Sequence, residues 1–169
     1  MAGKLNNKGL TLVELMIAMA IASIVIGSIT YFMAASTKSY RKANDEITLQ
    51  LEAQTILNQL NELIIEAYNV KMNDVTDMLT IYGGELIYYI KLENNKLMLN
   101  KKQSGLEIDT ADTWILFGEY VNTFEVKDTG DNNDNSSILI SFELSKNGSS
   151  YKVSNSLIAL RNKIKAISD

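Results

Sequence analysis

Apolar residues are concentrated in one uninterrupted stretch near the start of the chain. From Gly9 to Thr37 the only charged residue is Glu14, and residues 15–35 form a run of 21 positions without a charge. At about 1.5 Å rise per residue, a helix over this run is about 31 Å long, which matches the ~30 Å hydrocarbon core of a bilayer. The pattern predicts a membrane-spanning helix.

Three simpler interpretations of this stretch are a plain signal anchor, a secretory signal peptide and a buried core helix. A secretory signal peptide has an apolar region of ~7–15 residues, whereas this run is longer and continues into a second helical pattern. A core helix that is apolar all round needs more covering elements than a chain of this size provides. The plain anchor stays open as an alternative. Lys4 and Lys8 favour a cytoplasmic N-terminus, although Lys38 and Arg41 on the other side weaken that signal.

Beyond the apolar run, the hydrophobic positions recur at spacings of three and four, which is typical of an amphipathic helix. Since no Gly or Pro interrupts residues 28–67, we expect one long helix from about Thr11 to Tyr68. We interpret the apolar stripe of its second half as core, and the stripe consists of Ala53, Ile56, Leu57, Leu60, Leu63, Ile64 and Ala67.

After about residue 78 the pattern changes to short β-rich runs separated by turn residues. Residues 85–93 and 96–102 predict a hairpin around Asn94-Asn95, and residues 114–126 predict one or two further strands. Alternation over residues 138–144 predicts another strand, which a turn at residues 146–149 connects to a last strand beginning near Tyr151. The expected fold class is therefore α+β, with a long N-terminal α-helix packed on a C-terminal antiparallel β-sheet.

Composition removes several classes of function. The chain has no cysteine and no histidine, so it lacks a thiolate nucleophile, a disulfide framework and the commonest general base and metal ligand. The net charge is −4 with no long basic run, so we expect no direct nucleic-acid binding. The best enzymatic alternative is a pair of carboxylates, either Glu107 with Asp109 or Asp131 with Asp134, and both pairs are expected to be solvated surface charge. We therefore expect a protein that is not an enzyme.

One loop has part of the pattern of a calcium site. Asp131, Asn133 and Asn135 have the alternating oxygen ligands of such a loop. Ser136 stands where the turn requires Gly, and Phe142 stands where the bidentate Glu belongs. A solvated loop is the favoured interpretation, with calcium as the ion if a metal binds; no other cofactor is expected.

The sequence K-G-L-T-L-V-E-L at residues 8–15 resembles the cleavage and methylation site of class III signal peptides in type IV pilins and pseudopilins. The resemblance implies that a prepilin peptidase cuts between Gly9 and Leu10 and methylates the new amine of Leu10. Glu14 then occupies the fifth mature position. Leu10 stands where this family most often has Phe, and Tyr31 stands where many major pilins have a helix-kinking proline.

Glu14 is expected to act in assembly. A carboxylate in a spanning helix is costly and usually has a partner or a function. One turn into the mature helix, it could pair with the cationic N-terminus of a neighbouring subunit, and in a filament core of low dielectric constant such pairing favours one register.

Later segments resemble the sheet of W-type minor pilins and J-type pseudopilins. They are residues 84–89, residues 119–124 and the ending at residues 157–162, where Arg161 and Asn162 are expected to play a structural role at the end of the sheet.

We therefore expect three parts: a leader at residues 1–9, a transmembrane and filament-core helix at residues 10–36, and an extracytoplasmic pilin-like domain at residues 37–169. The implied function is a minor pilin of a type IV pilus, anchored by a single membrane pass and then built into an extracellular filament with other pilin subunits. A pseudopilin of a type II secretion or DNA-uptake system is the first alternative, and an anchored binding module that does not polymerise is the second.

Overall fold

The computed structural model describes residues 11–73, 77–106, 112–128 and 137–160. In these residues one helix, α1 (Leu12–Ile65), precedes a series of antiparallel strands. The chain divides into two compact units, residues 1–43 and residues 44–169. The strands are β1 (Asn69–Asn73), β2 (Met78–Gly83), β3 (Leu86–Glu93), β4 (Lys96–Gln103), β5 (Ile115–Gly118), β6 (Val121–Asp128), β7 (Ser137–Lys146) and β8 (Ser149–Ala159).

The helix ends at Ile65, slightly before the expected Tyr68, because the chain after it forms backbone hydrogen bonds with the sheet. The amide of Ala67 donates to the carbonyl of Ile64 at 3.1 Å, which tightens the last turn. The amide of Tyr68 donates instead to the carbonyl of Tyr82 at 2.9 Å. Tyr68 therefore already belongs to the strand pairing that continues into β1.

The strands form two sheets where one was expected. One sheet has five strands in the order β1-β2-β3-β4-β5, and the other has three in the order β6-β7-β8. The predicted hairpin at Asn94-Asn95 is β3–β4, and the predicted turn at Asn147-Gly148 joins β7 to β8. All four turn residues have positive φ, as two-residue hairpin turns of type I′ require. The α+β fold class is confirmed, with a long helix packed on antiparallel sheets.

The two sheets separate at Glu119 and Tyr120, between β5 and β6. Tyr120 has a φ of 62°, which redirects the chain out of the first sheet. The junction stays hydrogen-bonded to both sheets: the amide of Val121 donates to Asn95 at the β3–β4 turn, and the amide of Ser145 in β7 donates to Tyr120. The crossover is therefore fixed to both sheets through backbone bonds.

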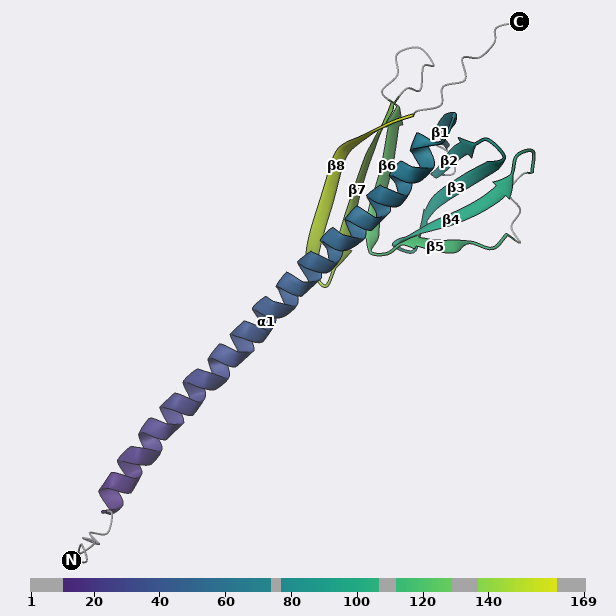
Figure 1. The fold of residues 1–169 in the computed structure, drawn as a ribbon. Helices are drawn as coiled ribbons and strands as arrows, with labels where there is room; N and C mark the ends of the chain where they lie inside the picture. Colours follow the sequence, from purple (N-terminus) through teal and green to yellow (C-terminus); the bar gives the residue numbers. More distant parts are fainter. Residues whose placement is uncertain (1–10, 74–76, 107–111, 129–136, 161–169) are drawn as a thin grey trace, which may run out of the picture. The chain divides into compact units, whose positions relative to one another are not determined.

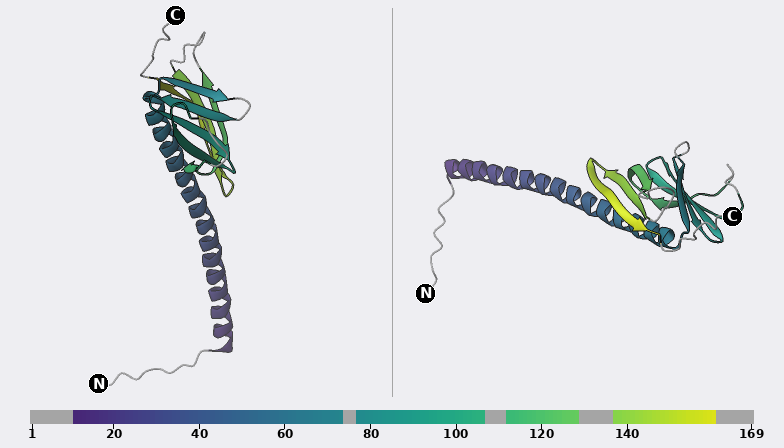
Figure 2. Two further views of the ribbon diagram at one scale, coloured as in Figure 1. Left: turned by 90° about the vertical axis from the view of Figure 1, so that its right-hand side faces the viewer. Right: turned by 90° about the horizontal axis from the view of Figure 1, so that it is seen from above.

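In the second unit α1 runs beside the strands of both sheets (Figure 1, Figure 2). Buried side chains of the helix and of both sheets form one hydrophobic core. The predicted helix stripe is confirmed as core, with Leu57 and Leu63 half-buried and its other members buried. Leu49, which the prediction did not include, extends the stripe by one turn. The sheets contribute Val70, Leu79, Ile81, Ile90, Leu97, Val121, Ile138, Ile140, Phe142, Leu144 and Ile158.

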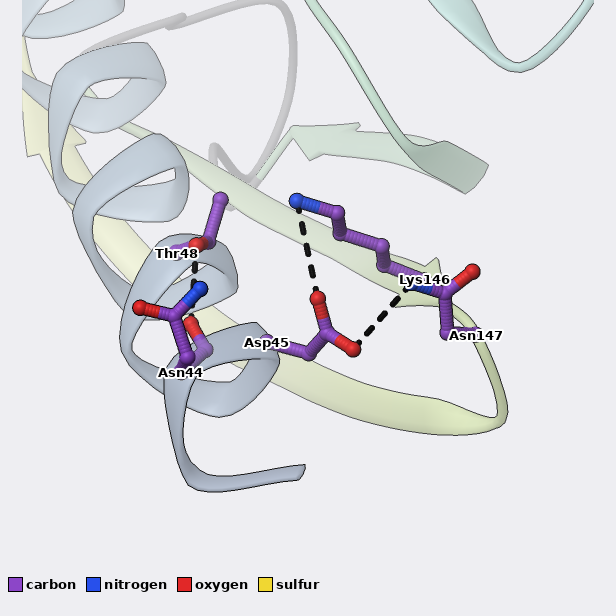
Figure 3. A network of polar contacts seen from close by, with 5 residues as sticks. All are labelled: Asn44, Asp45, Thr48, Lys146 and Asn147. Carbon is purple, nitrogen blue, oxygen red and sulfur yellow. Dashed lines mark hydrogen bonds and ion pairs between the residues drawn. The ribbon is translucent and has the colours of Figure 1, made fainter. Parts of the chain in front are cut away.

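Two carboxylates of α1 fasten the helix to the strands beside this core. Glu52 Oε1 accepts a hydrogen bond at 2.7 Å from the amide of Glu119, at the crossover between the sheets. Asp45 binds the β7–β8 turn: its Oδ2 accepts from the amide side chain of Asn147 at 3.1 Å, and its Oδ1 lies 3.6 Å from Nζ of Lys146 (Figure 3). We call the contacts of Asp45 with Lys146 and Asn147 the hairpin clamp.

Candidate processing and assembly site

The first turn of α1 is closed by a reciprocal pair of side chains, Thr11 and Glu14. Glu14 Oε2 accepts hydrogen bonds from the backbone amide and the hydroxyl of Thr11, both at 2.9 Å. In return, the Thr11 hydroxyl oxygen accepts from the backbone amide of Glu14 at 3.2 Å. This is a capping box, in which each side chain satisfies a backbone amide that has no partner inside the helix.

The structure thus gives Glu14 a local role that the sequence analysis did not assign to it. Its carboxylate lies at the N-terminus of its own helix, where the helix dipole favours negative charge. Thr11 was not predicted to have a role, although the spacing Thr-x-x-Glu before an apolar run is a recognised start signal of a helix. Within the described residues, both hydrogen bonds that Glu14 accepts go to Oε2.

The apolar part of α1 contributes nothing to the core of the chain. Every residue from Leu12 to Asn44 is exposed, including Ile24 at 71% and Phe32 at 73%. The helix is long and apolar enough to cross a membrane by length and composition. An exposed apolar surface of this extent requires lipid or other protein surfaces to cover it.

The serine and threonine hydroxyls of residues 15–35 are hydrogen-bonded within the helix itself. The hydroxyls of Ser23, Ser28 and Thr30 donate to the carbonyls four residues earlier at 2.8–2.9 Å. A bilayer core supplies no water for such groups, so internal bonds of this kind are what a spanning helix needs. The stretch can therefore be surrounded by hydrocarbon with no hydroxyl of these three residues left unpaired.

Several predicted site residues lie outside the described residues. They include the processing pair Gly9 and Leu10, the terminal pair Arg161 and Asn162, and the calcium candidates Asp131, Asn133 and Asn135. The carboxylate pairs of the enzymatic alternative, Glu107 with Asp109 and Asp131 with Asp134, lie there as well. The roles expected for all of these residues stay predictions.

The chain was compared with known families, curated proteins and solved structures. The model of the prokaryotic N-terminal methylation motif matches residues 4–30. No curated protein and no solved structure matches the chain. The matched segment contains the predicted cleavage position, the capping box and most of the apolar run, whereas the resemblance of the C-terminal strands to W-type and J-type subunits is not addressed by it and stays a prediction.

The matched motif indicates how a protein that carries it is processed and assembled. Its signal peptide implies processing by a prepilin peptidase, membrane anchoring before export, and assembly with other pilins; proteins of this kind are structural and not enzymatic. The predicted signal peptide and the predicted α+β fold are both found in this chain. Residues 4–30 carry the class III signal peptide of type IV pilins, on a chain with the α+β architecture of a pilin-like protein.

Proposed function

We propose that this protein is a minor pilin of a type IV pilus, inserted in the membrane by α1 and then incorporated into an extracellular filament. The observation that carries the proposal is that every residue from 12 to 44 is exposed, on a helix whose first part lies within the matched methylation motif at residues 4–30. An apolar helix without a partner in its own chain is suited first to lipid and then to equivalent helices of other subunits.

The core of the second unit also supports a role for the exposed apolar residues outside the chain. Its first member along the chain is Leu49, so the described residues before Leu49 are not needed to bury the sheets. The apolar residues of the first unit are therefore available for contacts outside the chain. Assembly can use them without exposing the core.

Glu14 is proposed to select the register of neighbouring subunits. After cleavage, the methylated amine of Leu10 is a cation at the start of each mature helix. The capping box engages Glu14 through Oε2, and a carboxylate oxygen can accept more than one hydrogen bond. One side chain can therefore cap its own helix and pair with the amine of a neighbour, an interaction that a medium of low dielectric constant strengthens.

The experiment separates the two roles of Glu14 by measuring incorporation into sheared filaments. Glu14→Gln keeps a side-chain oxygen that can accept from Thr11 but removes the charge, whereas Thr11→Val removes the hydroxyl and keeps the charge. We expect Glu14→Gln to insert in the membrane at the wild-type level and to be strongly depleted from filaments, with Thr11→Val depleted less. Normal incorporation of Glu14→Gln contradicts the pairing role.

A pseudopilin is the alternative that the same motif supports, because pseudopilins share this signal peptide. The distinction lies in where the processed subunit is found. A minor pilin copurifies with long surface filaments, whereas a pseudopilin stays with a short filament of the secretion or DNA-uptake machinery. A processed subunit that never enters surface filaments overturns the pilus assignment and leaves the pilin-like identity standing.

A further inference from the structure

The turn between β7 and β8 contains the one Asn-Gly pair of the sequence, Asn147-Gly148. Both residues are exposed, and both have positive φ, 51° and 82°. In an Asn-Gly pair no side chain of the second residue hinders the approach of its backbone nitrogen to the asparagine side chain. This pair is therefore the most reactive sequence in the chain for deamidation.

The hairpin clamp places the reactive side chain in a defined contact. Asn147 donates its side-chain amide to Oδ2 of Asp45 at 3.1 Å, while Lys146 lies 3.6 Å from Oδ1 of the same carboxylate (Figure 3). The Asp45–Lys146 pair is largely shielded, since its side chains are 14% and 23% exposed, whereas the hydrogen bond from Asn147 lies at the surface. The Lys146 ammonium also lies over the ring of Tyr120 at 4.9 Å, which holds it near the turn.

We propose that Asn147 is a deamidation site that the closed clamp protects, and that its product prevents the clamp from closing again. Deamidation at Asn147 would thus occur only after the β7–β8 turn has separated from α1, and it would keep the two apart. It acts on the domain and does not depend on the pilus assignment.

The reaction needs only the chain and water. The backbone nitrogen of Gly148 attacks the side-chain carbonyl carbon of Asn147, a C–N bond forms, and the side-chain nitrogen leaves as ammonia. Water then opens the resulting succinimide ring at either carbonyl, which gives aspartate or isoaspartate. The overall change is the gain of one water and the loss of one ammonia, with no oxidant or reductant.

Ring closure requires the Asn147 side chain to turn toward its own backbone, away from Asp45. The bond to a charged acceptor therefore opposes the reaction while the clamp is closed. Once formed, the product carries a carboxylate where the amide donor was. In the aspartate product a second carboxylate then faces that of Asp45, and a nearby like charge is unfavourable.

The β3–β4 turn provides a matched control within the same molecule. Asn94 and Asn95 have φ values of 52° and 60°, so they occupy the same kind of two-residue turn and are also exposed. The residue after Asn94 is Asn95 and the residue after Asn95 is Lys96, so neither asparagine precedes a glycine. Turn geometry and exposure are thus similar, while the following residue differs and Asn95 donates its side-chain amide to Oδ1 of Asn122 at 2.6 Å.

The first experiment ages the purified full-length protein in detergent micelles at mildly alkaline pH, in heavy-oxygen water. Peptide mapping then measures oxygen incorporation at each asparagine. We expect incorporation at Asn147 ahead of Asn94 and Asn95. We expect Asp45→Ala to accelerate it roughly tenfold, the factor that corresponds to about 1.4 kcal/mol of lost protection. The control Glu52→Gln, at the other helix-to-strand contact, leaves the rate unchanged.

The second experiment tests the consequence by hydrogen exchange at residues 44–48 and at the β7–β8 turn. Asn147→Asp imitates the product, and Asn147→Gly removes the same hydrogen bond without adding charge, while both residues tolerate positive φ. We expect faster exchange in Asn147→Asp than in Asn147→Gly. Equal exchange in the two variants, or equal deamidation at Asn147 and Asn95, overturns the proposal.

Discussion

Residues 12–43 and residues 44–65 belong to the same helix but differ in what surrounds their apolar side chains. In the first part Ile24 and Phe32 are more than two-thirds exposed, whereas in the second part Leu49, Ile56 and Leu60 are fully buried. Local helix propensity cannot explain this difference, because both parts are helical. The second part is amphipathic and covers two sheets of its own chain, while residues 15–35 of the first part carry no charge and are all exposed.

The largest expected change in the free energy of unfolding comes from truncating a buried side chain in residues 44–65 of α1. Leu60→Ala removes a fully buried side chain and should lower the free energy of unfolding by about 2–5 kcal/mol. Denaturant unfolding of the full chain in micelles, followed by the fluorescence of Trp114, measures it. The matched change in the exposed part, Ile24→Ala, should leave this free energy unchanged; equal losses in both variants would contradict the comparison.

A second test removes a polar contact of the covered part. Glu52→Ala deletes the acceptor of the Glu119 amide and should cost about 1.5–3 kcal/mol, because the hydrogen bond involves a charged group and is partly buried. The same unfolding measurement applies. Glu62→Ala, a change at an exposed glutamate of the same helix, is the control and should have little effect.

A third test overfills the contact between the helix and the sheet crossover. A Cβ on Gly118 would lie 2.5 Å from Cδ1 of Ile56, so Gly118→Ala should destabilise the domain by about 1–3 kcal/mol. Combining it with Ile56→Ala should cost less than the sum of the two single changes, since the obstructing atoms are gone. Simple additivity would show that the close approach is relieved elsewhere.

The smallest expected effect lies on the outer surface of the three-stranded sheet. Lys127 and Glu125 form an ion pair at 3.5 Å, with side chains 72% and 63% exposed. Lys127→Ala should change the free energy of unfolding by less than about 0.5 kcal/mol, because solvent screens such pairs. A loss comparable to that of Glu52→Ala would mean that this exposed ion pair stabilises the domain as much as the partly buried contact of Glu52 does.

The sequence predicted the elements whose signal is local and periodic. The stripe from Ala53 to Ala67 and the alternation of β7 both follow from spacing alone, and both are found. Strand β1 was missed because Val70 and Met72 are its only apolar residues, and its pairing with β2 makes it a strand. The division into two sheets depends on the conformation of Tyr120, which no local pattern indicates.

The same distinction between local and long-range signals applies to the candidate site and to the hairpin clamp. The motif around Glu14 is contiguous in sequence and was found, and the Thr11 partner could have been found from its spacing. The hairpin clamp joins Asp45 to Asn147 across about a hundred residues, so only the packed structure brings its members together.

The most direct test of the account is the intact mass and N-terminal residue of the membrane form, made with and without a co-expressed prepilin peptidase. We expect the peptidase to remove residues 1–9 and to leave a methyl group on Leu10, with the helix from Thr11 onward retained. An intact leader in the presence of active peptidase would contradict assignment to the pilin pathway and favour an anchored binding module that does not polymerise.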